Sequence, residues 1–179
     1  MNCYLGEMTH VQRPALEEMP AFYHGYVQRL NGSDLFEVMR ASTSLATRTF
    51  AAVGEERSLF RYAETKWSVR EVVQHLTDCE RILSYRALCF SRGEKCALPG
   101  FDEDAYVAHA DADRRSWSSL ISEWHHVRSG TMDLFDSFTP EMLRISGTAN
   151  GGLVTVRALG WIVAGHTEHH LHIITERYV

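Results

Sequence analysis

Apolar residues recur at helical spacing in four long segments of the chain, and no segment alternates convincingly as a β-strand would. The pattern predicts helices over residues 33–53, 68–92 and 155–177, and a further helix that begins at 111 or 113 and ends at 138. Helices of roughly 20 to 27 residues exceed the globular average and are typical of helical bundles. The sequence therefore predicts an all-α fold built on four long helices.

Local signals mark the ends of these helices. Ser33 is the expected N-cap of the first helix, and Thr155 is the expected N-cap of the last. Ser68 and Glu71 form a capping box, in which each side chain accepts a hydrogen bond from a backbone N–H. Pro140 ends the third helix because proline lacks an N–H and disfavours a helical residue before it.

The connecting segments are predicted to be irregular. Residues 93–110 form a long loop, and residues 146–153 form a glycine-rich turn centred on Asn150-Gly151. The first 32 residues carry prolines between aromatic side chains, and we expect them to pack on the bundle. No boundary divides the chain, so residues 1–179 are predicted to form a single domain.

Two histidines stand where a bundle helix would normally place leucine. His166 and His170 lie one turn apart, near the middle of the apolar stripe of the last predicted helix. His169 and His172 fall outside that stripe. Two buried imidazoles either bind one metal ion together or each need a polar partner in the core.

His75 on the second predicted helix is the best candidate for a third metal ligand. It lies at the edge of the apolar stripe and therefore faces a neighbouring helix. Three imidazoles with an open coordination position are typical of catalytic rather than structural metal sites. Neutral imidazoles bind zinc, nickel, iron and copper, so the type of ligand does not identify the ion. Cys79, one turn after His75, is either a fourth ligand or, as we favour, a small core residue.

Three known metal motifs do not fit the sequence. A zincin requires glutamate directly after the first histidine, whereas Glu168 is the second residue after His166. A zinc deaminase requires a Pro-Cys-x-x-Cys segment, which does not follow here. A di-iron bundle requires a matched set of Glu-x-x-His motifs, and Glu123–His126 supplies one without its counterparts. Glu168 lies off the histidine stripe, and we expect it to be solvated.

Composition narrows the range of functions. The chain of 179 residues has a net charge of −5 and no basic run, which argues against nucleic acid or an anionic membrane as partner. No apolar run approaches the roughly 18 residues of a membrane span, and residues 1–14 do not resemble a secretory signal. The four cysteines form no Cys-x-x-Cys pair. We therefore expect a cytoplasmic protein that acts on a small molecule.

Two segments resemble the signatures of a known family. Residues 66–76 read Lys-Trp-Ser-Val-Arg-Glu-Val-Val-Gln-His-Leu, similar to the K-W-S-x-x-E-x-x-x-H-L signature of the DinB-like (YfiT-like) metalloproteins. Residues 165–170 read Gly-His-Thr-Glu-His-His, similar to the closing G-H-x-x-H-H element of that family. The resemblance continues through residues 78–81, 98–104 and 147–151, so it covers nearly the whole chain from Ser33 onward.

The resemblance implies a four-helix bundle of up-down-down-up order, often a homodimer. It also implies a divalent metal ion (zinc, nickel or iron) held by His75, His166 and His170. Family members with assigned activity are mainly transferases or isomerases that use low-molecular-weight thiols, and others are described as metal-dependent hydrolases. We therefore expect a metal-dependent transferase that activates such a thiol for addition to an electrophile. The alternatives are a hydrolase that uses a metal-bound water, and a non-catalytic metal- or ligand-binding bundle of the stress response.

Four further residues are candidates for contact with the reactants. Arg86 either holds an anionic group of the substrate or thiol or, as we slightly favour, pairs with an acidic neighbour. Asp102 and Glu103 either close over the site and act as a base or, as we favour, cap their loop and remain in solvent. Asn150 either contacts the ligand or serves only in its turn, which is the simpler explanation.

Overall fold

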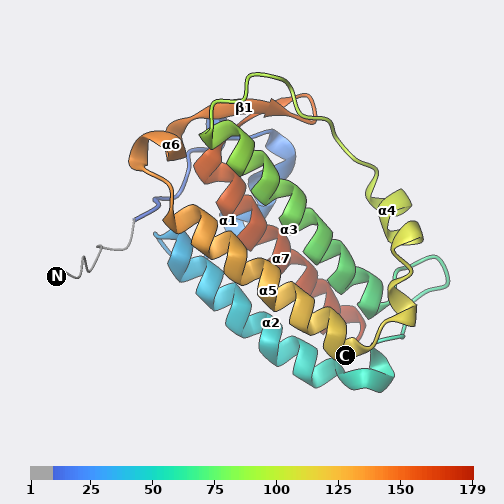
Figure 1. Cartoon of the computed structure of the whole chain (residues 1–179). Helices are drawn as coiled ribbons and strands as arrows, with labels where there is room; N and C mark the ends of the chain where they lie inside the picture. Colours follow the sequence, from blue (N-terminus) through green and yellow to red (C-terminus); the bar gives the residue numbers. More distant parts are fainter. Residues whose placement is uncertain (1–9) are drawn as a thin grey trace, which may run out of the picture.

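The computed structural model describes residues 10–179, and four long helices dominate it (Figure 1). They are α2 (Leu35–Arg57), α3 (Val69–Ser91), α5 (Trp117–Asp136) and α7 (Val156–Arg177). Helices α2 and α7 run in one direction and α3 and α5 in the other, so their order is up-down-down-up (Figure 1). Helix α3 packs against α5 and α7, and α2 packs against the same two. The predicted four-helix bundle is confirmed.

Short elements connect the long helices. Before α2 come η1 (Leu16–Glu18), η2 (Ala21–Tyr23) and α1 (His24–Arg29); between α3 and α5 come α4 (Glu103–Ala110) and η3 (Ala112–Arg114). Between α5 and α7 come α6 (Pro140–Arg144), β1 (Ser146–Ala149) and β2 (Gly152–Thr155). Helix α1 packs on α7, and α4 packs on α3. No helix in residues 10–179 combines the length and apolarity needed to cross a membrane.

The first long helix begins one residue later than expected. Its N-cap is Asp34, whose Oδ1 accepts hydrogen bonds from the backbone N–H groups of Phe36 (2.9 Å) and Glu37 (3.3 Å). The prediction of Ser33 as the cap is therefore wrong. A carboxylate at this position also interacts favourably with the helix dipole, which a serine hydroxyl does less strongly.

The caps of two other helices match the sequence prediction. Ser68 and Glu71 form the full capping box of α3, and Thr155 caps α7. Helix α5 begins at Trp117, later than expected, because the preceding chain is interrupted at Asp111. This residue has a left-handed conformation (φ 50°) and separates α4 from η3.

Two predicted loops contain regular structure. Residues 146–155 form an antiparallel β-hairpin, so the expectation of no strand is wrong. Asn150 (φ 50°) and Gly151 (φ 74°) make its two-residue turn, in which both positions favour Asn or Gly. Strands of four residues are too short for their alternation to stand out. The long loop over residues 93–110 likewise contains α4, which Asp102 caps.

Buried apolar side chains form two clusters, one toward each end of the bundle. One cluster contains Phe90 and Trp161, and the other contains Leu76 and Trp124. Between them, one level of the bundle carries buried polar side chains from all four long helices. We call it the polar layer, and it comprises Ser42, Thr77, Glu80, Arg128, Thr131, His166 and Thr167.

Arg128 and Glu80 form an ion pair at the centre of the polar layer. Their side chains are 1% and 2% exposed, and Nε and Nη2 of Arg128 donate to the two carboxylate oxygens at 2.8 and 2.9 Å. Nη2 also donates to Thr167 Oγ1 at 2.8 Å, and Nη1 donates to Ser42 Oγ at 2.9 Å. One guanidinium thus connects α5 with the other three long helices and is itself fully paired.

Loss of one partner of this pair should be strongly destabilising. We expect Glu80→Ala to lower the free energy of unfolding by about 3–5 kcal/mol, because it leaves a buried guanidinium without its counterion. Arg114→Ala is the control, since it removes an exposed pair with Asp111 (3.1 Å) and should change stability by no more than about 0.5 kcal/mol. Urea unfolding followed by circular dichroism measures both. Equal losses would contradict a bracing role for the buried pair.

Candidate metal centre

Three imidazole rings meet where α3 packs against α7. His75 comes from α3, and His166 and His170 come from successive turns of α7. Nε2 of His166 lies 3.1 Å from Nε2 of His75 and 3.1 Å from Nε2 of His170. The structure therefore brings together the three histidines selected from the sequence, and we call them the histidine cluster.

Hydrogen bonding alone does not satisfy the histidine cluster. A neutral imidazole carries one N–H and one lone pair, so Nε2 of His166 has a single site with which to meet two neighbouring nitrogens. A divalent ion bonded to three Nε2 atoms at about 2.0–2.1 Å in tetrahedral geometry would set them about 3.3 Å apart. The 3.1 Å separations are close to that value. The donor set therefore fits a metal ion better than it fits a hydrogen-bonded core.

Burial keeps the three imidazoles neutral. It lowers the pKa of His75 to about 4, although the charge of Asp104 acts in the opposite direction. Burial, with a smaller contribution from the His75 and His169 rings, lowers the pKa of His170 to about 3. Burial and the neighbouring imidazoles also hold the pKa of His166 well below its usual range. The neutral ring is the form that binds metals, so the cluster is ready to do so at neutral pH.

Cys79 lies next to the histidine cluster. Its Sγ and ligand nitrogens of His75 and His166 lie within 4.8 Å of one another, so these three residues form a second candidate set. However, Sγ is 3.6 Å from both Nδ1 and Nε2 of His75, which places it over the ring rather than along the Nε2 lone pair. Burial raises the pKa of the Cys79 thiol to about 12. This geometry favours His170 over Cys79 as the third ligand.

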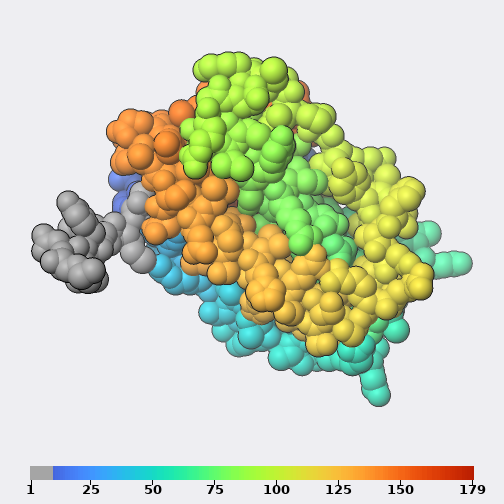
Figure 2. All heavy atoms as spheres, in the orientation of Figure 1, coloured from blue at the N-terminus to red at the C-terminus, as the bar shows by residue number. Residues whose placement is uncertain are grey.

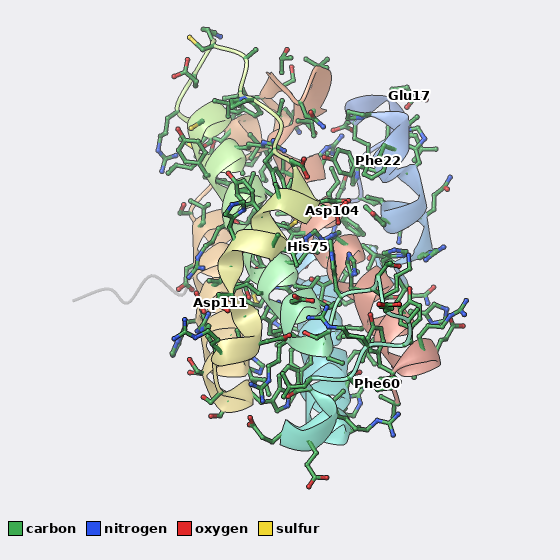
Figure 3. All side chains as sticks on the ribbon, turned by 90° about the vertical axis from the view of Figure 1, so that its right-hand side faces the viewer. Glu17, Phe22, Phe60, His75, Asp104 and Asp111 are labelled. Atoms are coloured by element: carbon green, nitrogen blue, oxygen red, sulfur yellow. The ribbon has the colours of Figure 1, made fainter. Side chains whose placement is uncertain are left out.

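A cleft of about 410 Å³ opens onto the histidine cluster, a volume typical of small-molecule sites. His166 and Cys79 line it at the cluster, and aromatic side chains line it elsewhere: Phe22, Tyr23, Tyr26 and Phe101. A smaller cavity of about 230 Å³ reaches His170, and Asp104 lines both spaces. In the view of Figure 3, Asp104 is labelled next to the buried His75, with Phe22 above them. The cluster is therefore accessible to a small ligand.

The position of Asp104 was not anticipated from the sequence. It lies in the first turn of α4, a segment that we expected to be a loop. Helix α4 and η3 form a ridge along one edge of the molecule (Figure 2). Because α4 packs on α3, this ridge carries carboxylates to the mouth of the cleft.

The other candidate residues all line the cleft. Arg86 has no carboxylate within 4.0 Å among the described residues, so the ion pair that we favoured is not formed. Asp102 caps α4 by accepting from the Ala105 backbone N–H at 3.0 Å, as expected, and Glu103 follows it along the wall. Asn150 serves in the hairpin turn and also lines the cleft.

The remaining polar residues of α7 lie outside the histidine cluster. His169 Nδ1 is 3.1 Å from Nη1 of Arg29, and His172 Nε2 is 3.2 Å from the carboxylate of Glu176. Glu168 is only partly exposed rather than fully solvated, and burial raises the pKa of its carboxyl group.

Gly165 allows α1 to approach the cluster closely. A Cβ at this position would overlap the backbone carbonyl of Tyr26. The Tyr26 ring then packs edge-on against the His166 ring, with 5.6 Å between centroids. A glycine inside a predicted helix, directly before a ligand candidate, was the sequence signal for this contact.

Comparison with known proteins identifies the family of the chain. A model of the DinB superfamily matches residues 36–174, which is most of the chain. The chain belongs to the DinB superfamily. No curated protein matches this DinB chain in a sequence search.

Two solved structures are similar to this DinB protein. YfiT from Bacillus subtilis, described as a probable metal-dependent hydrolase with an unusual four-helix bundle topology, has a TM-score of 0.69 and 20% identity. That match covers 92% of this chain and 91% of YfiT. A mycothiol-dependent maleylpyruvate isomerase has a TM-score of 0.66 and 14% identity, over 77% of this chain and 58% of the isomerase. At these identities the likeness shows the fold.

The close approach at Gly165 gives a testable prediction. We expect Gly165→Ala to lower the free energy of unfolding by about 1–3 kcal/mol, because the added methyl group forces the backbones of α1 and α7 apart. Gly130→Ala on α5 is the matched control; its Cβ would meet no atom within 4 Å, and it should stabilise by about 0.5–1 kcal/mol. Chemical denaturation measures both. If Gly165→Ala leaves the free energy of unfolding unchanged, the packing of α1 does not depend on this contact.

Proposed function

We propose that the protein binds one divalent metal ion through His75, His166 and His170. One observation carries the proposal: the Nε2 atom of His166 lies 3.1 Å from the Nε2 atoms of both His75 and His170, and burial keeps all three imidazoles neutral. A metal ion supplies the electrophilic partner that these nitrogens do not find in one another. The ion would be zinc, nickel or iron, all of which accept imidazole ligands.

We further propose that the site is catalytic. Three protein ligands and an adjoining cleft leave a coordination position for a small molecule, which a closed structural site does not offer. A metal ion in such a site lowers the pKa of a thiol or water that binds to it. The aromatic side chains of the cleft provide an apolar surface for the second reactant.

The proposed reaction is the transfer of a low-molecular-weight thiol to an electrophile. Sulfur ligands suit zinc and the softer divalent ions, and the aromatic side chains among the cleft residues can contact an organic electrophile. The name of one structural neighbour, a mycothiol-dependent isomerase, points to the same class of reactant. The homodimer and the cytoplasmic location remain predictions.

Metal content tests the ligand set. We expect one ion per chain in the wild type, and little or none in His166→Ala and His170→Ala, because each variant removes one of three ligands. Cys79→Ser and the exposed control His126→Ala should retain the ion. Elemental analysis after loading with zinc and gel filtration measures all five proteins. Loss of zinc in Cys79→Ser with retention in His170→Ala would replace our ligand set with His75, Cys79 and His166.

Turnover tests the reaction. With glutathione or cysteine and a chlorinated bimane, the thiol sulfur forms a bond to carbon while chloride leaves and the thiol proton passes to buffer. We expect the zinc-loaded wild type to accelerate this reaction and His166→Ala to show only the background rate, as followed by bimane fluorescence. Nitrophenyl esters should remain intact. Ester cleavage without thiol transfer would instead establish a hydrolase, and no turnover of either kind would contradict catalysis.

A further inference from the structure

Arg86 is a buried cation without a buried anion. Three arginines are buried in the part of the chain that the structure describes, and two of them pair with carboxylates: Arg70 with Glu55, and Arg128 with Glu80. Arg86 is 4% exposed yet has no carboxylate within 4.0 Å. Its Nη2 donates to the backbone carbonyl of Pro99 at 2.7 Å, and its guanidinium also bonds the Tyr23 hydroxyl.

These two partners leave further N–H groups of the guanidinium able to bond a ligand, and they are not sealed in the core but reach the cleft. An arginine side chain has five N–H donors arranged to meet a carboxylate in a bidentate manner. Burying such a charge without a counterion is costly, and native structures normally avoid it. Arg86 lines the cleft, so an anionic group on a ligand has direct access to it. The missing counterion therefore points to a carboxylate on the ligand.

Another wall of the cleft, formed by the start of α4, carries unpaired negative charge. Asp102, Glu103 and Asp104 all line it, and none forms an ion pair with a lysine or arginine among the described residues. Asp102 caps α4, and the dipole of α4 partly stabilises the negative charges of Glu103 and Asp104 in its first turn. Glu103 nevertheless acts on Tyr23, Tyr26 and Cys79 electrostatically, so its charge is directed into the cleft.

A ligand with only one kind of charge does not fit these two walls. A simple anion would satisfy Arg86 but would be repelled by three carboxylates. A simple cation would satisfy the acidic turn and leave Arg86 unpaired. Tyr23 and Tyr26 also line the cleft, where their rings can contact an ammonium group.

We infer that the cleft binds a small zwitterion, with its carboxylate on Arg86 and its ammonium group against Glu103 and Asp104. The inference rests on the proposed function in one respect: the thiol of the same molecule reaches the histidine cluster. Arg86 lies seven residues after Cys79 on α3, which is about 10 Å along the axis, and Cys79 Sγ lies within 4.8 Å of ligand nitrogens of His75 and His166. Its side chain leans toward the helix N-terminus and so shortens the distance to the cluster. The ligand class is therefore a small amino-acid thiol.

Four matched thiols test this charge selection. L-cysteine carries both charges, cysteamine only the ammonium group, mercaptopropionate only the carboxylate, and ethanethiol neither. Isothermal titration of the zinc-loaded protein gives the four dissociation constants, and zinc content is measured after each titration. We expect L-cysteine to bind about 10-fold or more tighter than either singly charged thiol, since each charged contact contributes roughly one such factor.

Variants of Arg86 and Glu103 measure the contribution of each wall to binding. Arg86→Gln should weaken the binding of L-cysteine and mercaptopropionate about 10-fold and leave that of cysteamine and ethanethiol unchanged. Glu103→Gln should weaken the binding of the two thiols with an ammonium group, L-cysteine and cysteamine, and leave the other two unchanged. Because L-cysteine and cysteamine also chelate zinc, the decisive quantity is the difference between wild type and variant for the same thiol. Arg86→Lys retains the charge and should recover part of the mercaptopropionate affinity. The control Asp133→Asn, on exposed α5 surface, should change none of the four.

The outcomes distinguish this inference from the proposed function. Equal affinity for the four thiols, or an equal loss of all four in Arg86→Gln, would overturn the charge selection and leave thiol binding intact. Absence of binding by every thiol to protein that retains its zinc would overturn the thiol chemistry itself.

Discussion

The polar layer is the constraint on which the rest of this structure depends. Its member His166 contacts His75 and His170, so three imidazoles meet inside the bundle, and their nitrogens need partners that an apolar core does not provide. The layer interrupts the core and divides it into two apolar clusters. Arg128 and Glu80 brace it, and their network includes Thr167, the residue that follows His166 in the sequence. The side chains that hold α3 and α7 together are thus neighbours of those that would hold the metal.

The two sides of the layer are built differently. On the side that faces α2 and α5, the Nε, Nη1 and Nη2 atoms of Arg128 all donate hydrogen bonds, and the side chain is buried. Toward the cleft, the covering elements are short and separate: the segment up to α1, which rests on α7 through Gly165, and α4, which rests on α3. Rigid long helices therefore fix the histidines, while short connections supply the aromatic and charged side chains of the cleft. This division suits a site that holds an ion firmly and selects small molecules at its mouth.

The sequence predicted the long helices, and the place of each histidine on its own helix, because both depend on periodicity along a single helix. His166 and His170 were recognisable from their place in an apolar stripe, and the capping box at Ser68 from residue types alone. The partners of Arg128 and the unpaired state of Arg86 were not predictable, because they depend on which helices become neighbours. The hairpin and α4 were missed because each is short, and α4 in turn determines where Asp104 lies.

X-ray absorption at the zinc edge of the zinc-loaded protein tests the central claim most directly, since it counts and identifies the atoms around the ion. The account predicts three imidazole nitrogens at about 2.0–2.1 Å, with the remaining position held by a light atom from solvent. A sulfur atom at about 2.3 Å would mean that Cys79 binds the ion, and fewer than three imidazoles would mean that the histidine cluster does not act as one site. Either result would contradict the account.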